Sequence, residues 1–100
     1  AIEYAREKGV LIVTAAGDRG ESLRVVPTYP ASYARDTENV LAVANVDVAD
    51  KLVRVRGKAS NYDPSTVAIA APGYNLTVAE PRNNLNRETG TGMSAAIVAG

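Results

Sequence analysis

Residues 10–20, VLIVTAAGDRG, decide the fold. The first seven form an apolar run that is too short for a helix of its own and contains several β-branched side chains. Such a run predicts a buried strand of a parallel sheet, although more helix is the alternative. Gly17 and Gly20 then end the strand in a polar turn.

Working outward, residues 1–8 predict the end of a helix, with Gly9 as a left-handed C-cap. Residues 39–46 and 67–71 predict two further buried strands, and residues 90–100 predict a buried helix. The remaining expectations are a long loop at 17–38, an edge strand or hairpin arm at 52–56, a short strand at 76–79 and a polar loop at 81–88. Helices alternating with apolar strands predict an α/β fold with a predominantly parallel sheet.

The amino-acid composition argues against several classes of function. Eleven Lys and Arg balance eleven Asp and Glu in the 100 residues, which argues against a nucleic-acid partner. The chain has no Cys and no His, so it supplies neither a thiolate nor an imidazole. No apolar run reaches the ~18–20 residues of a membrane span. Seventeen Ala and thirteen Val, with no Phe or Trp, bury little area per residue, which predicts a part of a larger α/β body.

Three short spans could carry chemistry: AAGDRG at 15–20, AAPG at 70–73 and TGTGMSAA at 89–96. Taken singly, the first two are ordinary turns. The third is either a helix start or a glycine-rich phosphate-binding loop, although it lacks the Lys of a P-loop. An unrelated nucleotide-binding module therefore stays open as an alternative.

Together and in order, these spans resemble the C-terminal half of a subtilisin-family (subtilase) catalytic domain. The matching segments are residues 13–20, 29–32, 39–47, 60–62, 67–73 and 89–100. The resemblance implies a part of a subtilisin-like three-layer sandwich, with residues 1–100 as an incomplete peptidase domain. It also implies serine endopeptidase chemistry, with the catalytic Asp and His expected upstream of Ala1.

The resemblance further implies partners and a location. The expected partners are the remainder of the same catalytic domain and an extended peptide or protein substrate, with no nucleic acid and no membrane. No cofactor and no metal ligand are expected in this chain, and calcium is expected elsewhere in the parent protein. Asp47, Asp50 and Asp63 are expected to form turns rather than to bind metal. Secretion or the secretory pathway is the expected location.

The chain departs from the family at its reactive positions. Gly92 stands at the position of the nucleophilic Ser, and glycine cannot attack a carbonyl. Asp18 stands at the position of the oxyanion-binding Asn, where an ionised carboxylate can only accept hydrogen bonds. Ser94 cannot replace the nucleophile, because two residues along a helix rotate a side chain by about 200°. Ala96 and Ile97 replace the family's Pro and His.

The chain keeps residues that would bind a peptide even though its reactive positions have changed. Ala15, Ala16 and Gly17 match the family segment that forms one wall of the primary specificity pocket, although tight packing alone would also explain such small residues. In line with the subtilase resemblance, we expect Asp18 and Gly92 to edge one cleft, since each follows a strand end on the same side of the sheet. The sequence therefore predicts a subtilisin-like peptidase fragment that is inactive in this copy. The alternative is a pseudoprotease that binds peptides, scaffolds or regulates.

Overall fold

Three strands rich in Val and Ala form one parallel sheet. They are β1 (Ile12–Ala15), β2 (Val40–Val46) and β3 (Val67–Pro72), and their order in the sheet is β1–β2–β3. The computed structural model describes residues 1–100. The predicted parallel sheet is thus confirmed, and the helical alternative for residues 10–16 is wrong.

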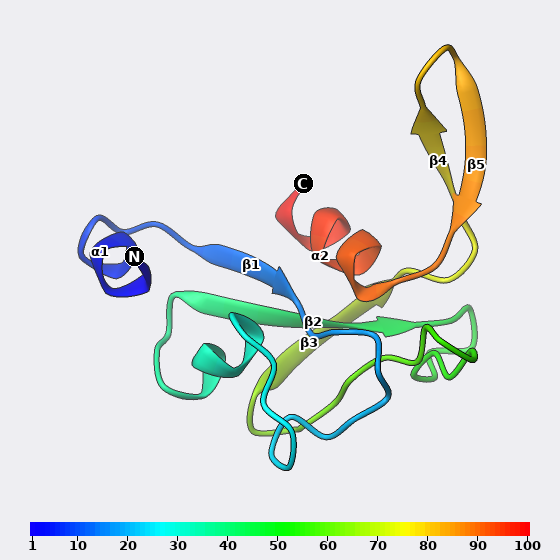
Figure 1. Cartoon of the computed structure of the whole chain (residues 1–100). Coiled ribbons are helices and arrows are strands. Elements are labelled where there is room, and N and C mark those ends of the chain that lie inside the picture. Colours follow the sequence, from blue (N-terminus) through cyan, green and yellow to red (C-terminus); the bar gives the residue numbers. More distant parts are fainter.

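A helix covers one face of the sheet, and a 3-10 helix covers the other (Figure 1). Helix α2 (Thr91–Ala99) packs against all three strands, whereas η1 (Ala31–Arg35) packs against β2. Successive side chains of β2 point to opposite faces, so Ala42 joins the core on the η1 side and Val43 joins the core on the α2 side. The result is the three-layer α/β arrangement that the sequence predicts.

Burial is less complete than the sequence predicts. Only the central strand β2 is well buried, whereas β1 is half-buried and residues 68–70 of β3 are exposed. The reason is that β1 and β3 are the two edges of the sheet in this chain. Helix α2 likewise buries one side, with Thr91, Ser94 and Ala95, and leaves Ile97 half exposed, so the expected buried helix is buried on its sheet-facing side only.

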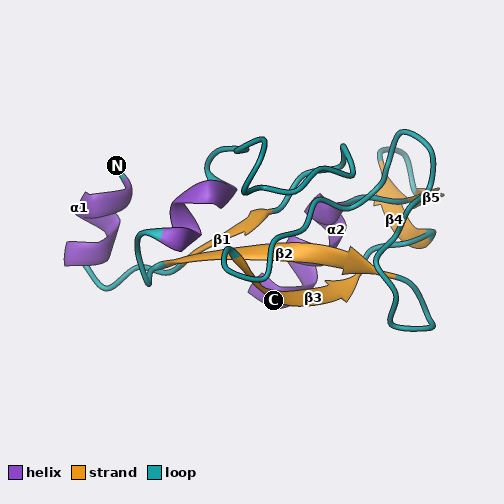
Figure 2. Ribbon diagram, turned by 90° about the horizontal axis from the view of Figure 1, so that it is seen from below, coloured by secondary structure: helices purple, strands orange, loops and turns teal.

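The two ends of the molecule carry a short helix and a hairpin (Figure 2). Helix α1 (Ile2–Glu7) is followed by Gly9 at φ +71°, which confirms the predicted left-handed turn. Strands β4 (Leu76–Glu80) and β5 (Asn84–Glu88) pair antiparallel and project from the sheet. The predicted short strand is confirmed, but the loop expected at 81–88 is wrong, because most of it is β5.

The edge strand or hairpin arm expected at residues 52–56 is confirmed only as a short hairpin arm at its first two residues. Leu52 makes a single antiparallel bridge to Val46. The next residue, Val53, donates its N–H to Asn45 O at 2.9 Å and accepts the N–H of Ser60 at 2.7 Å. These bonds hold Val53 in the core, whereas the residues after it are exposed and enter a turn. The alternation of apolar and polar residues in LVRVR therefore corresponds to one buried side chain rather than to a strand that continues to residue 56.

Candidate active site

The loop after β1 and the start of α2 are joined by two reciprocal hydrogen bonds. The N–H of Gly17 donates to Thr91 Oγ1 at 3.0 Å, and the N–H of Thr91 donates to Asp18 Oδ1 at 2.8 Å. These partners lie 74 and 73 residues apart in the chain. The expectation that the Asp18 loop and the start of the last helix lie close together is therefore confirmed.

Asp18 acts as the N-terminal cap of α2 from a distant part of the chain. The N-cap residue of this helix is Gly90, which has no side chain to bond the first free amides. The half-buried Asp18 carboxylate takes over that task for Thr91. Its negative charge also lies at the positive end of the helix dipole. Sequence analysis missed this role, and its only signal was a helix start with glycine in place of a capping side chain.

Gly92 lies in the first turn of α2 and is exposed. A Cβ atom built on Gly92 meets no heavy atom within 4 Å, so the glycine is not required by packing. Its amide belongs to the turn in which a helix supplies no acceptor of its own. The position thus offers a backbone donor and open space but no reactive side-chain atom.

Ser94 is fully buried and belongs to the core. Its Oγ donates to Ala71 O at 2.8 Å, which ties α2 to β3. A Cβ on Gly73 would collide with Ser94 Oγ and with Asn45 Oδ1, so the glycine permits this close approach. Ser94 therefore faces the sheet while Gly92 faces solvent, as the helical rotation predicts.

Asn61 holds the loop that carries Asp18. Its side-chain amide donates to Ala16 O at 3.0 Å, and its Oδ1 accepts the N–H groups of Arg19 and Glu21 at 3.2 and 2.9 Å. Its own N–H donates to Gly17 O at 2.8 Å. Asn61 is buried and thereby fixes the course of the chain on both sides of Asp18. Sequence analysis found the Ser60–Tyr62 segment but assigned no role to this asparagine.

Comparison with known proteins identifies the family of this chain. The sequence profile of the Subtilase family (peptidase S8) matches residues 1–100. The chain belongs to the subtilase family. It is 38% identical to the thermophilic serine proteinase of Bacillus sp. strain AK1 over 100 residues, which is all of this chain and 22% of that protein. It is 36% identical to thermitase of Thermoactinomyces vulgaris, again over all of this chain and 32% of that protein.

A solved structure shows the same fold. The A-subunit of the AB5 toxin from E. coli superposes with a TM-score of 0.84 and 27% identity, covering 97% of this chain and 36% of that one. This chain spans less than a third of the length of the two relatives named above. No helix in it is long and apolar enough to cross a membrane.

The three residues expected to form one wall of the specificity pocket, Ala15, Ala16 and Gly17, lie in different surroundings: the two alanines pack in the core, and only the glycine lines a cavity. Ala16 is fully buried under η1, and Ala15 packs on the α2 side of the sheet. Gly17 instead lines a polar cavity of about 310 Å³, together with Asp18 and Thr28. Gly17 has φ +109°, and a Cβ there would collide with the Asn61 amide, so this position requires glycine.

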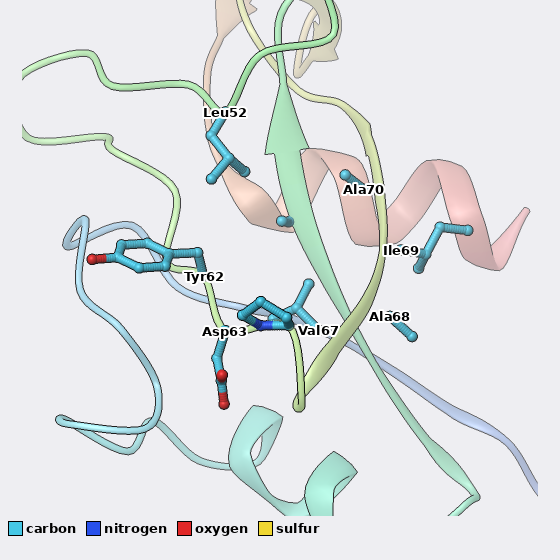
Figure 3. Close-up of a pocket in the computed structure, with 9 residues that line it drawn as sticks. Leu52, Tyr62, Asp63, Val67, Ala68, Ile69 and Ala70 are labelled. Carbon is cyan, nitrogen blue, oxygen red and sulfur yellow. The ribbon is translucent and has the colours of Figure 1, made fainter.

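A second, apolar pocket of about 370 Å³ lies along β3 and shares no lining residue with the cavity beside Asp18 (Figure 3). Leu52, Tyr62, Val67 and Ile69 line it. The carboxylate in its lining belongs to Asp63, which is hydrogen-bonded to Ser65 and Thr66 and is therefore not free to act as an acid or base. We find no group of three or more acidic side chains in the chain that could hold a metal ion.

Asp63 organises the turn before β3. Its Oδ2 accepts the hydroxyls of Thr66 and Ser65 at 2.7 and 2.8 Å, and these bonds lower the pKa of its carboxyl. Arg24 and Arg35 approach it at 3.6 and 3.7 Å. Asp63 thus forms a turn, as expected.

The other two aspartates also lie in turns. Asp47 accepts the N–H groups of Ala49 and Lys51 at 2.8 and 3.2 Å. Asp50 has φ +59° in the same turn. Both features are those of a turn-forming acidic residue.

Proposed function

We propose that the protein containing this chain binds extended polypeptides in a subtilase cleft without cleaving them. The observation that carries the proposal is Gly92, which occupies the family's nucleophile position and has no side-chain oxygen. Ser94, the nearest serine in the sequence, does not stand in for it, because its hydroxyl is buried and bonded to the backbone of Ala71. Membership of a peptidase family therefore describes the fold of this chain, and binding describes its function.

The oxyanion position supports the same conclusion. The carboxylate of Asp18 accepts the N–H of Thr91 and has no hydrogen to donate when ionised. A negative charge beside a developing oxyanion opposes the reaction that a subtilase must perform. In subtilisin itself, loss of the donor asparagine lowers kcat about 10²–10³-fold, so this change alone would reduce proteolysis severely.

Binding does not need the missing groups. An extended peptide binds largely through main-chain hydrogen bonds, with side chains entering pockets. The cavity beside Gly17 and the exposed first turn of α2 at Gly92 offer a pocket and a free region of backbone for this purpose. The secretory location and the calcium sites outside this chain stay predictions from the family.

The test is peptide hydrolysis by the full-length protein and its variants. We expect no turnover from the wild type and weak turnover from Gly92→Ser, provided that the catalytic Asp and His are present upstream. Asp18→Asn in addition should raise turnover about 10²–10³-fold over Gly92→Ser. Gly92→Ala is the matched control, since it adds the same Cβ into the same open space without the hydroxyl.

Two further readouts decide the proposal. The wild type and Gly92→Ala should bind a fluorescent extended peptide, which remains intact after prolonged incubation. A serine-directed phosphonylating probe should label Gly92→Ser and leave the wild type unlabelled. Labelling of the wild type, or wild-type turnover comparable to that of the double variant, would show that another residue is the nucleophile.

A further inference from the structure

We propose that the loop at residues 51–58 is an exosite for an acidic segment of the bound polypeptide. This basic loop reads KLVRVRGK and carries four of the eleven cationic side chains of a chain whose net charge is zero. The four are Lys51, Arg54, Arg56 and Lys58, and all are exposed. The proposal rests on the proposed function, because the cleft brings the polypeptide to this side of the molecule.

The cations of the basic loop are not used inside the chain. The three salt bridges of the molecule involve Arg6, Arg24 and Arg35, and none lies in this loop. No side-chain hydrogen bond satisfies the loop's cations either; Arg54 makes only a cation–π contact, 5.8 Å from the ring of Tyr62. The turn before the loop holds two carboxylates, Asp47 and Asp50, and neither forms a salt bridge to the loop, so four cations against two acids leave residues 47–58 with a net charge of +2. Exposed cations without an internal partner leave their charge available to attract a segment of opposite charge.

The basic loop is also fixed in place. Val53 is buried, and its backbone bonds to Asn45 and Ser60 hold the start of the loop. At the other end, Ala59 O accepts the N–H of Gly20 at 2.8 Å, and Ala59 pairs with Arg19. The cations therefore project from an anchored loop, which lowers the entropy lost when a partner binds.

The same anchor places the basic loop beside the candidate active site. Gly20 and the exposed Arg19 belong to the turn that carries Asp18. Arg19 lines the cavity beside Asp18, and its bridge to Ala59 puts the end of the basic loop next to that cavity, within reach of a polypeptide that extends from it on this side. This connection favours an acidic polypeptide over a nucleic acid, since the cations are tied to a peptide cleft and the chain as a whole carries no net positive charge.

The test compares two fluorescent peptides on the full-length protein. Both have the same extended core, and one ends in a run of Glu and Asp where the other has Gln and Asn. Arg56→Gln/Lys58→Gln should weaken the acidic peptide about fivefold at low salt and leave the neutral peptide unchanged. The matched control is Lys8→Gln/Arg82→Gln, which removes two exposed cations distant in sequence and should change neither affinity. High salt should abolish the acidic peptide's advantage.

The outcomes separate the two proposals. If the neutral peptide binds but acidity adds nothing, or if both double variants lose equally, the exosite is wrong and the proposed function stands. If neither peptide binds the wild type, the proposed function fails and the exosite fails with it. If the loop variant loses binding of duplex DNA or anionic vesicles but not of the acidic peptide, the loop serves another polyanion and the proposal is overturned.

Discussion

Replacing Asp18 by alanine should loosen the start of α2. The carboxylate supplies a cap to Thr91 N–H, and loss of such a cap costs about 0.5–2 kcal/mol. Its charge at the helix N-terminus adds about 0.3–1 kcal/mol. We therefore expect Asp18→Ala to destabilise this region by about 1–2 kcal/mol. Asp18→Asn retains an acceptor oxygen, loses only the charge and should cost less than about 1 kcal/mol.

Hydrogen exchange of the Thr91 amide in the full-length protein measures this effect directly, because that N–H is the donor of the bond. A loss of about 1.4 kcal/mol corresponds to tenfold faster exchange. Asp36→Ala is the control, since Asp36 is exposed and lies at the end of η1. Equal exchange in wild type and Asp18→Ala, or equal acceleration by Asp18→Asn and Asp18→Ala, would refute the capping role.

Three other changes test the framework around the site. The pKa of Asp63 is lowered in the folded state, so its contribution to stability is complete above its unfolded pKa of about 3.9 and is lost as the pH falls through the folded pKa. Asp63→Asn should therefore make the free energy of unfolding depend less steeply on pH in the acid range. An unchanged dependence would contradict this. Gly17→Ala should destabilise by about 2–4 kcal/mol in denaturant titration, because it adds backbone strain and a clash with Asn61, whereas Gly92→Ala should stay within about 1 kcal/mol of the wild type. The isolated 100-residue chain should associate or unfold non-cooperatively, since Leu11 is 58% and Ile97 49% exposed; a monomer in ultracentrifugation with a sharp thermal transition would disprove this.

The sequence predicts the parallel sheet well because β1, β2 and β3 are continuous apolar runs joined by long connections. It does not predict β5, whose segment NLNRE has little strand propensity. That strand forms because Arg82 and Asn83 adopt positive φ and turn the chain back on β4. Hairpin pairing of this kind depends on turn geometry, which a polar segment does not reveal.

The candidate site was predictable in position but not in its bonds. The spacing of the motifs indicates that Asp18 and Gly92 lie together. It cannot indicate that Asp18 caps α2, because the donor is a backbone amide 73 residues away. The same holds for Asn61, which bonds the backbone of a distant loop. Side-chain to backbone contacts over long separations leave no periodic pattern in a sequence.

The capping role gives Asp18 a structural task at the position that the subtilase resemblance assigns to the oxyanion-binding asparagine. An asparagine in that position must aim its N–H₂ at the substrate, whereas the carboxylate can only turn toward donors, and the first turn of α2 supplies one at 2.8 Å. Under the proposed function no nucleophile stands at position 92, so position 18 has no catalytic task, and its carboxylate gives the helix a cap that Gly90 cannot provide. The two departures are then compatible, because Asp18 stabilises the helix that carries Gly92. Gly92→Ser alone should accordingly give only weak turnover, because the carboxylate of Asp18 would still oppose a developing oxyanion, and Asp18→Asn is needed in addition to raise it.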